Sequence, residues 1–149
     1  MVSIDQIKQL REETGLSISE CKKALEDANG DMEKAKEVLK QWGKKVAEKK
    51  QVREVGEGLI TSYVHGTGKI GVLVDIRCET DFVARSDDFK EVSREIALQV
   101  ASMDPSSVEE LLRQPYIKEN SRTVKELISD YIAKLGENIV IHRFSRFQI

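Results

Sequence analysis

The side chains best suited to chemistry gather around one short stretch, residues 78–85. Five acids lie in it or close to it: Asp75, Glu79, Asp81, Asp87 and Asp88. Carboxylates can bind a divalent metal ion, which makes a metal-dependent hydrolase one hypothesis. However, Asp75 falls within a predicted strand whereas Glu79 and Asp81 follow it, so the three do not share one strand face. No histidine or nucleophile accompanies them, and the residues therefore argue against hydrolysis.

The aromatic residue Phe82 stands at the centre of this stretch, directly after Asp81 and before a small apolar pair. It occupies the corner between a predicted strand, residues 70–78, and a predicted helix, residues 87–103. An aromatic ring is oddly placed there if it only fills a core, and we interpret Phe82 as projecting from the surface. The alternative is that Phe82 covers the core beneath the corner and Asp81 is a turn residue.

Several blocks of sequence resemble one protein family. At the corner, residues 79–85 read Glu-Thr-Asp-Phe-Val-Ala-Arg. Near the N-terminus, residues 10–15 read Leu-Arg-Glu-Glu-Thr-Gly and residues 21–31 read Cys-Lys-Lys-Ala-Leu-Glu-Asp-Ala-Asn-Gly-Asp. Near the C-terminus, residues 134–139 read Lys-Leu-Gly-Glu-Asn-Ile. In this order they resemble the elongation factor Ts family, the guanine-nucleotide exchange factors of the translational GTPase elongation factor Tu.

The resemblance implies a function without bond chemistry. The chain is expected to bind elongation factor Tu with its GDP and to promote GDP release by disturbing the partner's Mg²⁺ site, as a non-enzyme that needs no cofactor. The residues implied at that site are those of the corner: Thr80, Asp81, Phe82 and Val83. Three N-terminal residues are implied to contact the GTPase: Arg11, Ile18 and Ser19. Family members usually carry two larger apolar residues at the last two positions, and Ser19 departs from that pattern.

Residues 1–43 are expected to fold as a three-helix domain. Ser3 with Gln6 and Ser17 with Glu20 form capping-box patterns that open the first two helices. Asn29-Gly30 separates the second helix from the third, which we expect to end at Gly43. The result would be a small bundle of limited stability on its own.

Two alternatives to nucleotide exchange rest on this half of the chain. The bundle resembles a ubiquitin-associated domain, which suggests a ubiquitin-associated-type protein-binding adaptor without exchange activity. That function would leave residues 55–149 unexplained. Residues 44–54, predicted as a linker helix, are rich in lysine and could bind RNA. No aromatic residue is interleaved there for base stacking, and we favour a solvated linker.

Residues 55–149 are predicted to form an α+β core domain. From Gly58 the apolar period changes to two, which gives strands at residues 59–64, 70–78 and 138–147. The second strand is nearly continuous in apolar residues and is therefore expected at the centre of the sheet. The predicted fold is an N-terminal three-helix ubiquitin-associated-like bundle, a linker helix, and a three-stranded antiparallel sheet with helices on one face.

One departure from the family bears on assembly. Longer members carry a second core half, or a helical hairpin, around residues 105–114, where this chain has only a short connection. A single half core presents less surface to a large partner, and the last strand is apolar on both sides at residues 139–141. Both features favour a homodimer in which two copies pair through their sheets. A monomer with that strand buried internally is the alternative.

Composition sets the broad class. Of 149 residues, 34% are charged and 40% apolar, and the net charge is −2. These values are typical of a globular protein and suggest neither nucleic acid nor a membrane surface as a direct partner. Two cysteines and two histidines, Cys21, Cys78, His65 and His142, cannot assemble a zinc-ligand pattern. Without a signal-peptide pattern or a membrane-length apolar run, we expect a soluble cytoplasmic protein.

Overall fold

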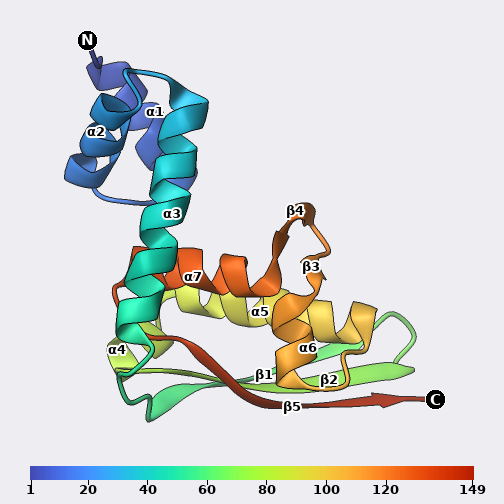
Figure 1. The fold of residues 1–149 in the computed structure, drawn as a ribbon. Helices are drawn as coiled ribbons and strands as arrows, with labels where there is room; N and C mark the ends of the chain where they lie inside the picture. Colours follow the sequence, from blue (N-terminus) through green and yellow to red (C-terminus); the bar gives the residue numbers. More distant parts are fainter.

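The structure, a computed structural model that describes residues 1–149, has a helical N-terminal part and a sheet-containing part (Figure 1). The helices are α1 (Ile4–Thr14), α2 (Ile18–Asp27), α3 (Met32–Lys50), α4 (Asp81–Ala84), α5 (Asp87–Met103), α6 (Val108–Arg113) and α7 (Val124–Leu135). The strands are β1 (Glu57–His65), β2 (Ile70–Cys78), β3 (Pro115–Tyr116), β4 (Glu119–Thr123) and β5 (Val140–Gln148). None of the helices combines the length and apolar character needed to cross a membrane.

The N-terminal bundle consists of α1, α2 and the first half of α3. Both expected capping boxes are present: Ser3 and Gln6 open α1, and Ser17 and Glu20 open α2. In each pair the two side chains accept hydrogen bonds from each other's backbone amides. The bundle has its own cluster of eight buried residues: Leu10, Leu16, Cys21, Ala24, Leu25, Ala28, Ala35 and Leu39.

The third helix does not end at Gly43 as the sequence suggested, because α3 continues over 19 residues. Glycine ends a helix when its φ angle is positive, as at Gly15 and Gly136 (φ 70° and 76°), and Gly43 is not among the residues with positive φ. Gly43 is buried against α7, where a Cβ atom would lie 3.6 Å from the Ala133 Cβ. Packing on α7 therefore keeps α3 helical, and the predicted linker helix is its second half.

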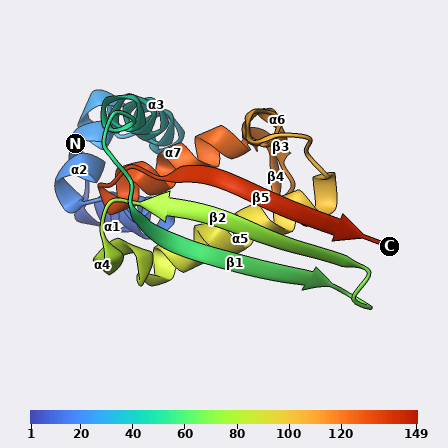
Figure 2. The ribbon, with the colours of Figure 1, turned by 90° about the horizontal axis from the view of Figure 1, so that it is seen from below.

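The three long strands form one antiparallel sheet in the order β1-β2-β5, with β2 at the centre as predicted (Figure 2). The side chains of β2 that point inward are buried: Val72, Val74, Ile76 and Cys78. Alternation along the strand sends Leu73 and Asp75 to the outer face. An irregularity between Asp75 and Ile76 shifts the pairing of β2 with β5.

Helices lie on one face of this sheet. α5 packs on β1 and β2, α6 packs on β5, and α7 lies against α5 and α3. The main core, a cluster of 18 buried residues, lies between the helices and the sheet, with Phe89 as its largest fully buried side chain. The predicted fold class, N-terminal helices followed by a three-stranded antiparallel sheet with helices on one face, is confirmed.

Two small elements were not predicted from the sequence. One is α4, whose four residues are too few to show a helical period. The other is the two-stranded ladder of β3 and β4. The buried side chain of Gln99 supports this ladder, because it donates to the Pro115 carbonyl at 3.0 Å and accepts from the Ile117 amide at 3.0 Å. Gln99 lies 16 residues before Pro115 and 18 residues before Ile117, so its hydrogen bonds to them leave no periodic pattern in the local sequence.

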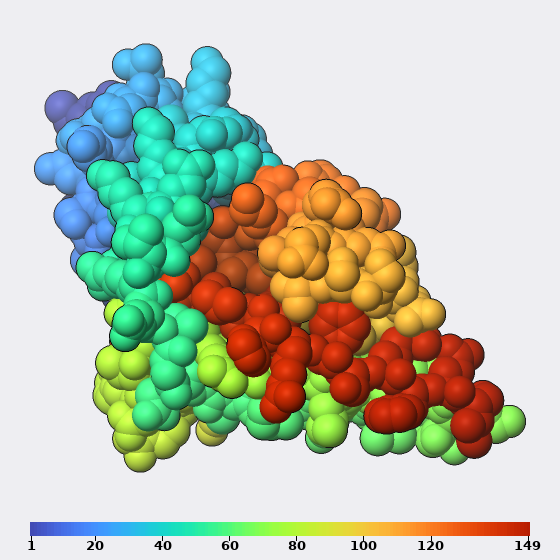
Figure 3. Space-filling view, turned by 60° about the horizontal axis from the view of Figure 1, so that its bottom comes forward, coloured from blue at the N-terminus to red at the C-terminus, as the bar shows by residue number.

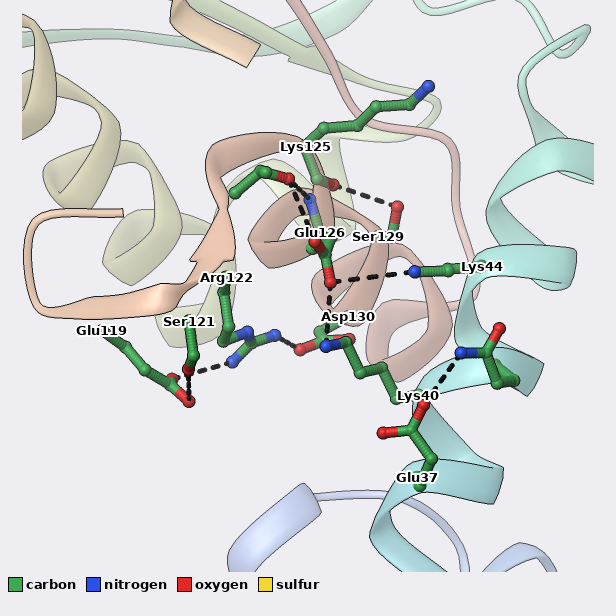
Figure 4. A network of polar contacts seen from close by, with 12 residues as sticks. Glu37, Lys40, Lys44, Glu119, Ser121, Arg122, Lys125, Glu126, Ser129 and Asp130 are labelled. Carbon is green, nitrogen blue, oxygen red and sulfur yellow. Dashed lines mark hydrogen bonds and ion pairs between the residues drawn. The ribbon is translucent and has the colours of Figure 1, made fainter. Parts of the chain in front are cut away.

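Ion pairs join α3 to α7 (Figure 4). Lys40 Nζ lies 3.0 Å from Glu126 Oε2, and Lys44 Nζ lies 3.8 Å from the same oxygen. The Lys40 ammonium holds the pKa of Glu126 below its ordinary value of 4.5. Beside this pair, Arg122 contacts Asp130. The N-terminal part of the chain is therefore attached to the core through α7 by packing and by charge.

Two hollows flank α7. One, of about 530 Å³, lies between α3 and α6 and is visible in Figure 3. The other, of about 470 Å³, lies between α3, α7 and β4. Neither is lined by any residue of the corner at residues 79–85. The corner therefore lies outside both of these hollows.

Candidate functional site

The corner is built as one helical turn, α4, placed directly after the central strand. Thr80 is its N-cap residue: the backbone there is extended (φ −124°, ψ 154°), and the hydroxyl accepts a hydrogen bond from the Val83 amide at 3.3 Å. Ser86 then caps α5, and its hydroxyl donates to the Val83 carbonyl at 2.7 Å. Two capped turns in succession give the chain a defined path from β2 to α5.

Phe82 projects from this turn and is 78% exposed. The two residues that follow face the other way: Val83 is 6% exposed, Ala84 is 3% exposed, and both belong to the main core. The ring therefore does not cover the core beneath the corner, which was the alternative. Asp81 is also exposed, and its Oδ2 accepts a hydrogen bond from Arg85 at 3.2 Å. The turn thus presents an aromatic ring and a carboxylate to solvent from a buried base.

A carboxylate from the far end of the chain fixes the backbone that leads into the turn. Glu137 Oε1 accepts hydrogen bonds from the Glu79 amide at 3.1 Å and the Thr80 amide at 2.9 Å, and its Oε2 accepts from the Thr80 hydroxyl at 2.7 Å. In return, the Glu79 carboxylate accepts from the Asn138 amide at 2.9 Å and lies 3.5 Å from Arg53 Nη1. Residues 79–80 and 137–138 therefore hold each other in both directions.

The thiol of Cys78 supports the corner from inside. It is buried and free, and its Sγ donates to the Thr80 carbonyl at 3.2 Å. The pKa of this thiol is raised to about 11. The main cause is burial, and the second is the negative charge of the nearby Glu137 carboxylate. The thiol consequently stays protonated and able to donate at neutral pH. Cys21, the other cysteine, is also free and buried, within the N-terminal bundle.

The contact residues predicted on the N-terminal bundle all lie on its surface. Ile18 begins α2 and is 57% exposed, whereas Leu16, two residues earlier, is buried in the bundle's cluster. Ser19 is exposed, and its hydroxyl lies 3.1 Å from that of Ser17. Arg11 is exposed in the last turn of α1. Residues 15–19 form the loop between α1 and α2 and the first residues of α2, and of the two apolar side chains in this loop Ile18 is the exposed one.

The structure does not bring the two predicted regions together, because the bundle and α4 lie toward opposite ends of α3 (Figure 1). The acids of the corner do not converge either, since Glu79 is held by residues 137–138 and Asp81 pairs with Arg85. No group of three or more Asp, Glu, His or Cys side chains lies close enough together to hold a metal ion. The two predicted regions are therefore separate exposed surfaces of the molecule.

The outer face of the sheet carries no helix (Figure 2). Four apolar side chains on it are at least half exposed: Ile60, Val64, Leu73 and Phe147. Asp75 lies among them, accepts hydrogen bonds from Arg77 at 3.0 Å and Arg143 at 3.3 Å, and has its pKa lowered chiefly by Arg77. The sequence indicated an apolar last strand at residues 139–141, but Ile139 and Ile141 are buried on the inner side. The exposed apolar surface is therefore on the opposite face and includes Phe147.

Sequence reasoning did not assign a role to Glu137 or Asn138. Both belong to the C-terminal block that resembles the family, and that resemblance was the only signal pointing to them. They lie 58 and 59 residues from Glu79 along the chain, and local periodicity cannot pair residues so far apart.

Comparisons with known proteins point to one family. A family model described as Elongation factor TS matches residues 79–149, beginning at the corner. The chain is 45% identical to Elongation factor Ts of Coprothermobacter proteolyticus over 193 aligned positions, which cover 99% of this chain and 98% of that protein. It is 42% identical to Elongation factor Ts of Thermotoga maritima over 191 positions (99% and 96%). It is 41% identical to Elongation factor Ts of Carboxydothermus hydrogenoformans over 194 positions (100% and 89%).

These alignments are longer than the 149 residues of this chain. The relatives therefore carry internal residues that have no counterpart here. The match nevertheless extends over nearly the whole chain and over most of each relative. At this level of identity and coverage, the chain belongs to the elongation factor Ts family.

Proposed function

We propose that this chain binds GDP-bound elongation factor Tu in the cytoplasm and promotes release of the GDP, as a guanine-nucleotide exchange factor and not as an enzyme. Membership in the elongation factor Ts family supports this proposal. The observation that carries the mechanism is the position of Phe82, which is 78% exposed on a turn whose next residue, Val83, is buried in the core. Such a ring can enter a partner without any loss of the protein's own packing.

An exchange factor weakens nucleotide binding only by binding the nucleotide-free partner more tightly than the nucleotide-bound partner. Much of a GTPase's affinity for its nucleotide comes from Mg²⁺, which bridges the phosphates and is held by a few side chains. Mg²⁺ demands near-ideal octahedral geometry, so a displacement of its ligands by about 1 Å weakens coordination strongly. A rigid group inserted beside that site is therefore sufficient to favour release.

The four residues of the corner have distinct parts in this mechanism. Phe82 inserts beside the partner's Mg²⁺ site, where burial of the ring contributes about 2–3 kcal/mol. Asp81 competes for hydrogen bonds there and repels the acidic surroundings of the ion. Thr80 caps the turn that directs both side chains, and Val83 anchors the turn in the core.

Contacts elsewhere complete the binding in this proposal. Residues 1–43 form one contact unit, whose exposed residues Arg11, Ile18 and Ser19 bind the nucleotide-binding domain of elongation factor Tu. Residues 55–149 form the other, in which β5 at the sheet edge binds a second domain of the partner. Residues 44–54 set the spacing between the two units. The exposure of Ile18 and the unpaired outer edge of β5 support these assignments.

We further propose that two copies pair through the outer faces of their sheets. The four exposed apolar residues of that face, and the lack of the internal residues that the relatives carry, support a homodimer. Sedimentation of the wild-type chain should give twice 16.9 kDa, and Leu73→Asp, which places a charge within the face, should give 16.9 kDa. A wild-type chain that sediments at 16.9 kDa even at high concentration would contradict the homodimer.

The exchange function is tested by the release of fluorescent GDP from elongation factor Tu in a stopped-flow experiment. The wild-type chain should accelerate release in a saturable manner. Phe82→Ala should lower the accelerated rate about 30- to 150-fold, the equivalent of losing about 2–3 kcal/mol of ring burial. The fold should not change, because the ring contacts solvent.

Met103→Ala is the control for this experiment, because Met103 is an apolar residue, 46% exposed, with no part in the proposed contacts. It should release GDP at the wild-type rate. Unchanged release with Phe82→Ala would contradict the role of the corner. If the wild-type chain does not accelerate release but binds ubiquitin, the adaptor function replaces the exchange function.

A further inference from the structure

We propose that Glu137 is a positioning residue for nucleotide exchange: its contacts with residues 79–80 fix the direction in which Phe82 projects. The proposal rests on the proposed function, because it concerns how the corner acts on elongation factor Tu. Glu137 itself touches neither the nucleotide nor the Mg²⁺ site in this account. It acts through the backbone that carries the ring.

The contacts of Glu137 are made at the entry to α4 rather than within it. Inside the turn, the Thr80 hydroxyl already accepts from the Val83 amide. Glu137 instead binds the amides of Glu79 and Thr80, which precede the turn, and also accepts the hydroxyl proton of Thr80. Hydrogen bonds to an ionised acceptor are stronger than neutral ones. One carboxylate thus fixes two successive peptide units and the N-cap side chain, which together set the axis of the turn.

Phe82 depends on that axis because no cluster of side chains holds the ring. It is 78% exposed and lies outside both hydrophobic clusters. A helix of one turn fixes few backbone angles through its own hydrogen bonds and is not stable in isolation. The direction of the ring is therefore set by what precedes the turn and by the buried residues beneath it.

The same contacts connect the corner to the segment that follows α3. Glu79 lies 3.5 Å from Arg53 Nη1, and the side-chain amide of Asn138 donates to the Arg53 carbonyl at 2.9 Å. Asn138 is 2% exposed, so this contact is shielded from water. The corner, the C-terminal block and the end of the linker therefore meet at one point. The position of Phe82 is thereby fixed relative to α3, which leads to the N-terminal contacts.

Two variants of Glu137 test the proposal in the fluorescent-GDP assay. Glu137→Ala removes all three hydrogen bonds and should lower the maximal release rate about tenfold, because loss of orientation acts on the rate. The half-saturating concentration should change less than about twofold, because the other contacts with the partner remain. Glu137→Gln keeps an oxygen for the two amides and should restore most of the rate.

A double variant separates positioning from general destabilisation. Because Glu137 acts through Phe82, Glu137→Ala should cause little further loss in a chain that already carries Phe82→Ala. A merely structural role would lower the rate by the same factor with and without the ring. Equal factors in the two backgrounds would overturn the proposal.

Glu110→Ala is the matched control, because the Glu110 carboxylate also accepts from the backbone amide and the hydroxyl of one residue, Ser106. That contact lies at α6, at the other end of the core from α4 (Figure 1). The control should exchange GDP at the wild-type rate. If Phe82→Ala slows release but Glu137→Ala does not, the positioning role is wrong and the proposed function stands. If neither variant slows release, the role of the corner in the proposed function fails as well.

Discussion

Phe82 at the corner and Ile18 on the N-terminal bundle have similar local settings. Each is an exposed apolar side chain near the start of a helix, and each helix has an N-cap hydroxyl that accepts a backbone hydrogen bond. The two N-cap residues differ in which carboxylate binds them. The capping box of Ser17 is completed three residues away, whereas Thr80 is held by Glu137, 57 residues away.

The start of α2 is therefore held by residues close to it in sequence, whereas the corner is held only when the whole core domain is folded. The loop at residues 15–19, which includes Ile18, depends on neighbours in sequence and on a cluster of eight buried residues. The corner depends on a core of 18 buried residues and on segments from both ends of the core domain. Local opening costs less where fewer buried contacts are lost. We conclude that the corner is the more rigid of the two regions and the loop the more adaptable.

The largest expected effect comes from weakening the smaller cluster. Leu25 is fully buried in it, and Leu25→Ala should cost about 2–5 kcal/mol because so small a core cannot refill the cavity. Hydrogen exchange should then show faster exchange of the amides of Cys21 and Glu20, which lie in the first turns of α2. The amides of Glu79 and Thr80 should keep their protection.

Val92→Ala is the control for that comparison, because Val92 is fully buried in the main core. It should raise exchange at the corner as well as in α5. If Leu25→Ala exposes the corner amides as much as those of α2, the two regions are not separate in stability.

A smaller effect is expected from Ile18→Ala. Ile18 is 57% exposed and belongs to neither cluster, so the fold should not change. Loss of about 1 kcal/mol of burial against the partner should raise the half-saturating concentration in the GDP-release assay about fivefold, while the maximal rate stays the same. Ile4→Ala, which removes an isoleucine that is 71% exposed on the same bundle, serves as the control. If Ile18→Ala lowers the maximal rate instead, the loop acts on the rate of GDP release as the corner does, and the difference between the two regions is wrong.

The smallest effect is expected at the joint between the two parts. Lys40 lowers the pKa of Glu126 below 4.5 in the folded protein. Such a carboxylate stabilises the fold above its unfolded pKa, and this contribution is lost as the pH falls through the lower folded pKa. Glu126→Gln should therefore lower Tm by about 2–4 °C at neutral pH and by less in acid well below that pKa. Glu37→Gln, on the same helix, should leave Tm unchanged, and a pH-independent effect of Glu126→Gln would exclude this ion pair as the cause.

Features whose causes lie nearby in sequence were predictable. The capping boxes at Ser3 and Ser17 open helices as expected, and α5 covers the predicted residues 87–103. The central place of β2 followed from its continuous apolar run. The outward direction of Phe82 was inferred from its position at a corner, and the structure places the ring in solvent.

Features whose causes lie elsewhere in the chain were not predictable. Gly43 lies within α3, where it packs against Ala133 of α7, and Thr80 is held by hydrogen bonds to Glu137. Ile141 is buried because it pairs with Ile76 of β2, whose side chain is on the core side of the sheet, and Ile139, just before β5, is buried in the same cluster. Periodicity shows which residues share a face of a helix or strand, but it does not show which neighbour covers that face.

The unbroken course of α3 has a mechanical consequence. A helix of 19 residues is about 28 Å long, and this one has its first turns in the N-terminal cluster and its middle against α7. A tilt of about 5° at one end of such a rod moves the other end by about 2–3 Å. A tilt of the bundle relative to the core therefore displaces the C-terminal end of α3 at Lys50, close in sequence to Arg53, which contacts Glu79 of the corner. The separation between the N-terminal bundle and the corner is thus set by one continuous helix.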